Sequence, residues 1–143
     1  MIAHISFKAI VDSILASSAM AATGSETDRP PLLTTDHTPM LESCARTALR
    51  TVAYELAPFL DNVELRGEPA DFEFLPEIDP AMNLPLEEAI CDITAHRVLH
   101  MFFITTWPAL STAHLDMASL AMEHLQASLM QRPGMNYRIR PDV

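Results

Sequence analysis

The sequence predicts a mainly α-helical protein: a small bundle of about four helices with an inserted β-hairpin and an extended C-terminal tail. Three observations predict this fold. Four segments repeat apolar residues at helical spacing, and a short acidic segment between the second and third alternates like a strand pair. Pro133 and Gly134 then end the last helical pattern ahead of a strand-like terminus. With 143 residues, the chain has room for one compact domain.

The first predicted helix begins after Ser6, a residue type suited to an N-cap, and runs to about Met20. Its helical spacing is set by the apolar residues Phe7, Ile10, Val11, Ile14 and Leu15. The following segment, Thr23 to Thr38, is rich in Gly, Pro, Ser, Thr and Asp. We expect an irregular loop there, and long loops of this kind are candidate contact surfaces.

The second predicted helix starts with Thr38 as N-cap and Pro39 at the first helical position, and Pro58 ends it. Its polar side combines Arg46 and Arg50 with Glu42, which indicates a mixed-charge face toward solvent. The buried face is predicted to hold Leu41, Ala45, Ala48, Leu49, Val52 and Leu56.

A β-hairpin is predicted at about residues 61–75. Val63 and Leu65 alternate with polar residues, Phe72 and Phe74 do the same, and Gly67 lies in the turn between them. Seven acidic residues lie between Asp61 and Asp79, so this is the most negative part of the chain. The carboxylates that we expect to be exposed on the hairpin are Glu64, Glu68, Asp71 and Glu73.

The third predicted helix opens at Pro85 and becomes apolar on every side from Val98 to Ile104. Such a stretch should lie at the centre of the bundle or be covered by another subunit. Arg97 falls among apolar positions, so it requires a partner: an intrachain ion pair with a carboxylate such as Glu55, or a pair across a subunit boundary. The buried stripe of this helix is predicted to be Leu86, Ala89, Ile90 and Ile93.

The fourth predicted helix begins near Trp107 to Ala109 and runs to about Met130. Its polar face is predicted to hold Thr112, Asp116, Ser119, Glu123 and Gln126, opposite Leu110, Met117, Ala121 and Leu125. Nine methionines are many for this length, and Met101, Met117 and Met122 are predicted to be adaptable core residues.

Composition excludes several classes of protein. Nineteen acidic against nine basic residues give a net charge of -10, which disfavours an electrostatic grip on nucleic acid. Cys44 and Cys91 have no CxxC spacing, so neither a disulfide framework nor a zinc knuckle is predicted. No apolar run approaches the roughly 18 residues of a membrane span, so no membrane partner is expected.

Four histidines raise the question of a metal site. His96 and His100 share a helical face, but a metalloprotease-type zinc site needs Glu beside the first histidine, where Arg97 stands. His114 and His124 fall near the apolar side of the next helix, so a four-histidine metal-binding protein or enzyme stays the alternative. No Gly-rich phosphate loop or GxSxG motif is present in the sequence. The prediction is a protein without catalytic residues, cofactor or metal.

The C-terminal tail, residues 133–143, follows a predicted bundle domain of residues 1–132. Its apolar residues Met135, Tyr137 and Ile139 alternate with Asn136, Arg138 and Arg140. A segment with one apolar and one cationic side can add to a partner's sheet edge or lie in a groove, and the alternative is a disordered basic tail. The predicted docking residues are Arg132, Tyr137, Arg138, Ile139 and Arg140.

The layout resembles the head-tail connector, or adaptor, proteins of tailed bacteriophages and prophages. The similar segments are TTDHTPMLESCARTALRTVAYELAPFL, the acidic hairpin, LPLEEAICDITAHRVLHMFF, the last helix and the RPGMNYRIRP ending, or roughly residues 34–140. This resemblance implies a ring, commonly of about twelve copies, that docks beneath the portal protein and carries the DNA channel toward the tail or neck proteins.

The resemblance also implies a location in the virion at the head-tail junction, after assembly in the host cytoplasm. DNA would pass through without sequence-specific binding, and the acidic hairpin would line the channel or a subunit interface, because repeated like charge around a ring repels DNA. A helical regulator that acts by protein contact is the other alternative.

Overall fold

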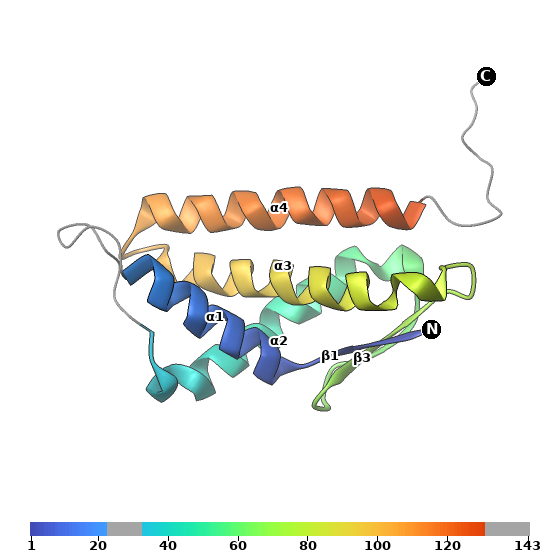
Figure 1. The fold of residues 1–143 in the computed structure, drawn as a ribbon, viewed down its shortest axis with the longest axis horizontal. Helices are drawn as coiled ribbons and strands as arrows, with labels where there is room; N and C mark the ends of the chain where they lie inside the picture. Colours follow the sequence, from blue (N-terminus) through green and yellow to red (C-terminus); the bar gives the residue numbers. More distant parts are fainter. Residues whose placement is uncertain (23–32, 131–143) are drawn as a thin grey trace, which may run out of the picture.

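The computed structural model describes residues 1–22 and 33–130, and it confirms a mainly helical fold. Four helices pack together beside a small antiparallel sheet (Figure 1). The helices are α1 (Phe7–Ala22), α2 (Thr38–Glu55), α3 (Asn83–Phe103) and α4 (Pro108–Met130). The strands are β1 (Ile2–Ile5), β2 (Leu60–Glu64) and β3 (Ala70–Phe74), with short 3-10 turns at Thr35–His37, Ala57–Phe59 and Pro80–Met82.

Helix α3 is the centre of the fold. It lies between α4 on one side and α1 and α2 on the other (Figure 1). Val98, Leu99 and Phe103 are buried, as expected of a segment at the centre of a bundle. Met101 and Ile104, however, are 40% and 54% exposed, so residues 1–22 and 33–130 do not cover the end of this helix on every side.

The sheet contains one strand more than the sequence predicts. The hairpin of β2 and β3 is present, and β1 pairs antiparallel with β3 to give the order β1-β3-β2. Ala3 and Ile5 alternate with exposed neighbours and join Phe72 and Phe74 in the core. The predicted hairpin is confirmed, and residues Ile2–Ile5, for which the sequence predicts no strand, add a third strand to it.

The helix boundaries follow local signals. Ser6 Oγ accepts a hydrogen bond from Ala9 N at 3.1 Å, which confirms Ser6 as the cap of α1. Helix α3 starts at Asn83, two residues before the predicted Pro85, because a 3-10 turn capped by Asp79 leads directly into it. In this turn Asp79 Oδ1 accepts from Ala81 N at 2.9 Å.

Candidate functional site

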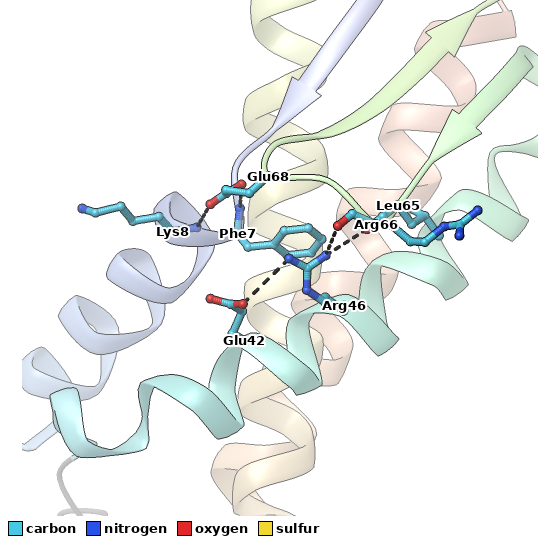
Figure 2. A network of polar contacts seen from close by, with 7 residues as sticks. All are labelled: Phe7, Lys8, Glu42, Arg46, Leu65, Arg66 and Glu68. Atoms are coloured by element: carbon cyan, nitrogen blue, oxygen red, sulfur yellow. Dashed lines mark hydrogen bonds and ion pairs between the residues drawn. The ribbon is translucent and has the colours of Figure 1, made fainter.

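The tip of the β2–β3 hairpin is hydrogen-bonded to the first turn of α1. Glu68 Oε1 accepts a hydrogen bond from Phe7 N and Glu68 Oε2 accepts one from Lys8 N, each at 3.0 Å (Figure 2). The first N–H groups of a helix have no partner within the helix, and its N-terminus carries partial positive charge. A carboxylate from 60 residues away therefore completes the cap that Ser6 begins.

Arg46 of α2 joins the same network. Its guanidinium carbon lies 4.0 Å from the centroid of the Phe7 ring, and its Nη1 donates to the Leu65 carbonyl at 2.9 Å (Figure 2). The side chain also lies 3.8 Å from Glu42 on its own helix. The sequence places Arg46 on a plain solvent face, and that is wrong, because this residue connects α1, α2 and the hairpin tip.

The remaining hairpin carboxylates have different surroundings. Asp71 Oδ1 accepts a 2.6 Å hydrogen bond from His4 Nδ1, and these residues face each other across the β1–β3 pair. Glu64 accepts from Arg66 N at 2.8 Å. Glu73, near the end of β3, is half-buried. Two of the four carboxylates predicted to be exposed on the hairpin therefore have partners within the fold: Glu68 caps a helix and Asp71 is paired within the sheet.

The Glu68 cap gives a direct stability prediction. Replacing Glu68 by Gln removes the negative charge and one of two acceptors at the start of α1, so we expect the free energy of unfolding to fall by about 1 kcal/mol. Urea denaturation followed by far-UV circular dichroism measures the change. The matched control is Glu73→Gln on the same hairpin, expected to change stability by less than about 0.5 kcal/mol. Equal effects of the two substitutions would contradict the capping role.

Arg97 has its partner within the chain. Its Nη1 lies 2.5 Å from Glu55 Oε1, with side-chain exposures of 17% for Arg97 and 35% for Glu55. This is the intrachain pair that the sequence suggests, and it ties the centre of α3 to the end of α2. Gln126 of α4 donates to the Glu55 carbonyl at 3.2 Å, so the three helices meet at this point.

The four histidines separate into different environments. His96 and His114 face each other with 3.0 Å between their Nδ1 atoms, while His100 Nδ1 lies 2.7 Å from Ser111 Oγ. His124 is exposed further along α4 and lines a different groove. The structure thus does not bring the four histidines together as one ligand set. In residues 1–22 and 33–130, no three His, Cys, Asp or Glu side chains are placed to hold a metal ion.

The two cysteines are free and half-buried. Burial, with the Glu87 charge next in importance, raises the pKa of the Cys91 thiol to about 11. The thiolate, which is the nucleophilic form, is therefore scarce at neutral pH. This side chain lies between β1, α1 and α3, and the arrangement favours a packing role for it.

The outer side of α4 exposes apolar side chains that the sequence does not predict to be exposed. This helix packs mainly against α3, and it buries one stripe made of Ser111, His114, Ala118, Met122, Leu125 and Leu129. Met117 and Leu120 lie outside this buried stripe and are 44% and 54% exposed. Ala113 and Ala127, which are also exposed, lie on the same side of the helix. We call these four residues the α4 outer stripe. Of the three methionines predicted to be core residues, only Met122 is buried, since Met101 and Met117 are exposed.

The other edge of α4 borders a groove and also exposes an apolar side chain. Leu115, 40% exposed, lines a groove of about 210 Å³ with Met101 and Arg97 of α3 and with Thr47 and Thr51 of α2. Exposed Asp116 and Glu123 lie on the ridge between this groove and the α4 outer stripe. Helix α4 therefore presents apolar residues on both sides of an acidic ridge, a pattern typical of a helix that contacts a further protein surface.

The predicted docking residues Arg132, Tyr137, Arg138, Ile139 and Arg140 lie outside the described residues, as does most of the loop after α1. Within the described part of the chain, no helix is both long and apolar enough to cross a membrane.

Comparisons with known proteins add no relatives. No protein-family model matches the sequence, and no curated protein or solved structure matches the chain.

Proposed function

We propose that the chain is a non-enzymatic structural subunit of the head-tail junction of a tailed bacteriophage or prophage. In this proposal the protein forms a homo-oligomeric ring between the portal protein and the tail or neck proteins, and DNA passes through the ring. The observation that carries the proposal is the α4 outer stripe, with Met117 and Leu120 about half exposed on a helix that packs mainly against α3.

The exposed residues of α4 support a subunit contact. Soluble monomers seldom leave large contiguous apolar patches uncovered, and methionine is enriched at the centres of interfaces between proteins. The adjoining groove at Leu115 and Met101 enlarges the apolar area on the same helix. A neighbouring copy packed along α4 would cover this area and would also bury the end of α3 at Ile104.

The net charge of -10 supports a role as a conduit. Copies arranged around an axis multiply the negative potential at the centre, so that DNA slides without binding. The C-terminal residues Arg132, Arg138 and Arg140 have the opposite charge, so this segment would dock on an acidic surface of the portal or of an adjacent ring. Glu64 and Glu73 are the hairpin carboxylates with fewest links to the rest of the fold, and they are the ones we assign to the channel or a subunit interface.

The first test is the copy number of the protein in particles of the phage that encodes it. Quantitative mass spectrometry, normalised to the major capsid protein, should find about a dozen copies per particle, as expected of one closed ring. Absence from purified particles would overturn the proposal and would favour a helical regulator that acts by protein contact.

A substitution on α4 tests the surface itself. Leu120→Asp places a charge in the centre of the α4 outer stripe, and it should lower incorporation into particles at least about tenfold, because a buried unpaired charge costs several kcal/mol at an interface. The side chain is 54% exposed in the described chain, so the isolated variant should keep its helix content and melting temperature.

The matched control is Leu84→Asp, which changes a leucine of similar exposure, 62%, at the start of α3. We expect this variant to enter particles normally. Normal incorporation of the Leu120→Asp variant would contradict the assignment of α4 to the subunit contact while leaving the copy-number test unaffected.

A further inference from the structure

A pair of histidines lies at the contact between α3 and α4. His96 Nδ1 and His114 Nδ1 are 3.0 Å apart, and the centroids of the two rings are 5.2 Å apart. His114 is 9% exposed and stacks against Phe103 with a centroid distance of 6.4 Å. One turn further along α3, His100 is held by Ser111, whose hydroxyl donates to the His100 carbonyl at 2.9 Å. Three imidazole rings thus lie at the part of the α3–α4 contact that is nearest to the turn between the two helices.

The short distance fixes the number of protons between the two rings. A hydrogen bond between two Nδ1 atoms needs one nitrogen with a proton and one without. On the far side of the pair, His96 Nε2 lies 3.9 Å from Asp92 Oδ1. A proton added to His114 places positive charge inside the contact between the two helices, and two facing N–H groups cannot form the hydrogen bond that joins the rings.

The surroundings of His114 oppose an added proton on this ring. Burial, followed by the charges of His96 and His100, lowers the pKa of His114 below its ordinary value of 6.5. On α4 itself the nearest acidic residue along the sequence, Asp116, is exposed on the outer ridge. The other charged groups at this contact come from α3 and α2: Asp92 beyond His96, and Arg97 in its pair with Glu55.

We propose that the His96–His114 pair is a pH-sensitive latch that holds α4 to α3 at neutral pH and releases it in acid. Helix α4 packs mainly against α3, so weakening this one contact can loosen the helix while α1, α2 and the sheet stay packed. The folded state takes up a proton at His114 less readily than the unfolded chain does. The contribution of neutral His114 to the stability of the fold is therefore fully present above pH 6.5. It is lost progressively as the pH falls below that value. The latch goes beyond the proposed function and does not depend on it.

Trp107, the one tryptophan in the sequence, lies in the turn between α3 and α4. Its fluorescence can therefore be used to follow the packing of α4 on α3. Its backbone N–H donates to the Phe103 carbonyl at 2.8 Å, and its side chain is half-buried. In the wild-type chain, we expect Trp107 emission to move to longer wavelength between pH 7.5 and 5, ahead of any large loss of far-UV circular dichroism. The melting temperature should fall by roughly 5 °C over the same range.

His114→Gln tests the latch, because glutamine can still accept a hydrogen bond from His96 but does not take up a proton in this range. This variant should lose most of the pH dependence of both signals. His124→Gln, at an exposed position on the same helix, is the control and should behave like the wild type. His96→Gln is the reciprocal change, and it provides the same test if the His114 variant does not fold.

Two results would overturn the latch. One is a wild-type protein whose Trp107 emission and melting temperature are the same at pH 7.5 and 5. The other is full wild-type acid sensitivity in a folded His114→Gln or His96→Gln variant, which would assign the transition to other groups.

Discussion

Replacing Glu55 by Gln is expected to lower the free energy of unfolding by about 2 kcal/mol. Arg97 keeps its charge in this variant, and with 17% side-chain exposure it has little water to replace the lost carboxylate. Breaking a fully buried ion pair costs roughly 3–5 kcal/mol and breaking an exposed pair roughly 0–1 kcal/mol, so this partly exposed pair should lie between them. Urea denaturation followed by circular dichroism measures the loss.

The surface pair of Lys8 and Asp12 provides a matched control, since both side chains are well exposed, at 82% and 63%. Asp12→Asn should change stability by less than about 0.5 kcal/mol. A second comparison adds Arg97→Met to Glu55→Gln. The double variant should be more stable than Glu55→Gln alone, because the unpaired charge is removed. A double variant that is no more stable would argue against a charge left without its partner.

Replacing Arg46 by Met is expected to destabilise the fold by about 2 kcal/mol. The variant keeps the apolar length of the side chain but loses the bond to the Leu65 carbonyl, the contact with the Phe7 ring and the pair with Glu42. Because these partners belong to three different elements, the loss should also free the hairpin tip. Hydrogen exchange of the amides of Phe7 and Lys8, which bond to Glu68, should therefore rise.

Arg50→Met is the control for this change. Arg50 is exposed on the same helix, so its substitution should alter stability by less than about 0.5 kcal/mol and leave the hairpin exchange unchanged. Arg46→Lys should recover part of the stability, because an ammonium group can bond one carbonyl but lacks the planar fork of arginine. If Arg46→Met and Arg50→Met had equal effects, Arg46 would not connect the hairpin to the helices.

The helical part of the fold could be predicted from the sequence because its signals are local. Apolar residues recur at helical spacing in α1 to α4, Ser6 marks one start, and Pro108 begins α4 after the end of α3. The hairpin was predictable for the same reason, since Val63 and Leu65, and then Phe72 and Phe74, alternate with polar residues on either side of a turn that contains Gly67 and Pro69. The pairing of Arg97 with Glu55 followed from charge, because an arginine in an apolar stripe needs an acidic partner.

The features that escaped prediction depend on contacts between distant residues. Strand β1 is only four residues long, and its partner β3 begins at Ala70, so the alternation of Ala3 and Ile5 is too short a signal to recognise. The roles of Glu68 and Arg46 depend on where the hairpin tip lands on α1. The exposure of Met117 depends on how much of α4 its neighbours cover, and hydrophobicity alone does not indicate that.

The central position of α3 also shapes the order in which the chain can fold on the ribosome. Residues Asn83–Phe103 are made after α1 and α2, which both pack against them, and after β1, which must wait for Ala70–Phe74 before it can pair. Until roughly a hundred residues have emerged, α3 is therefore not yet present to cover the apolar side chains of α1 and α2, such as Ile10, Ile14 and Leu49. Once α3 has emerged, it can cover these apolar side chains, so we expect slow translation before this helix to be more harmful to yield than slow translation after it.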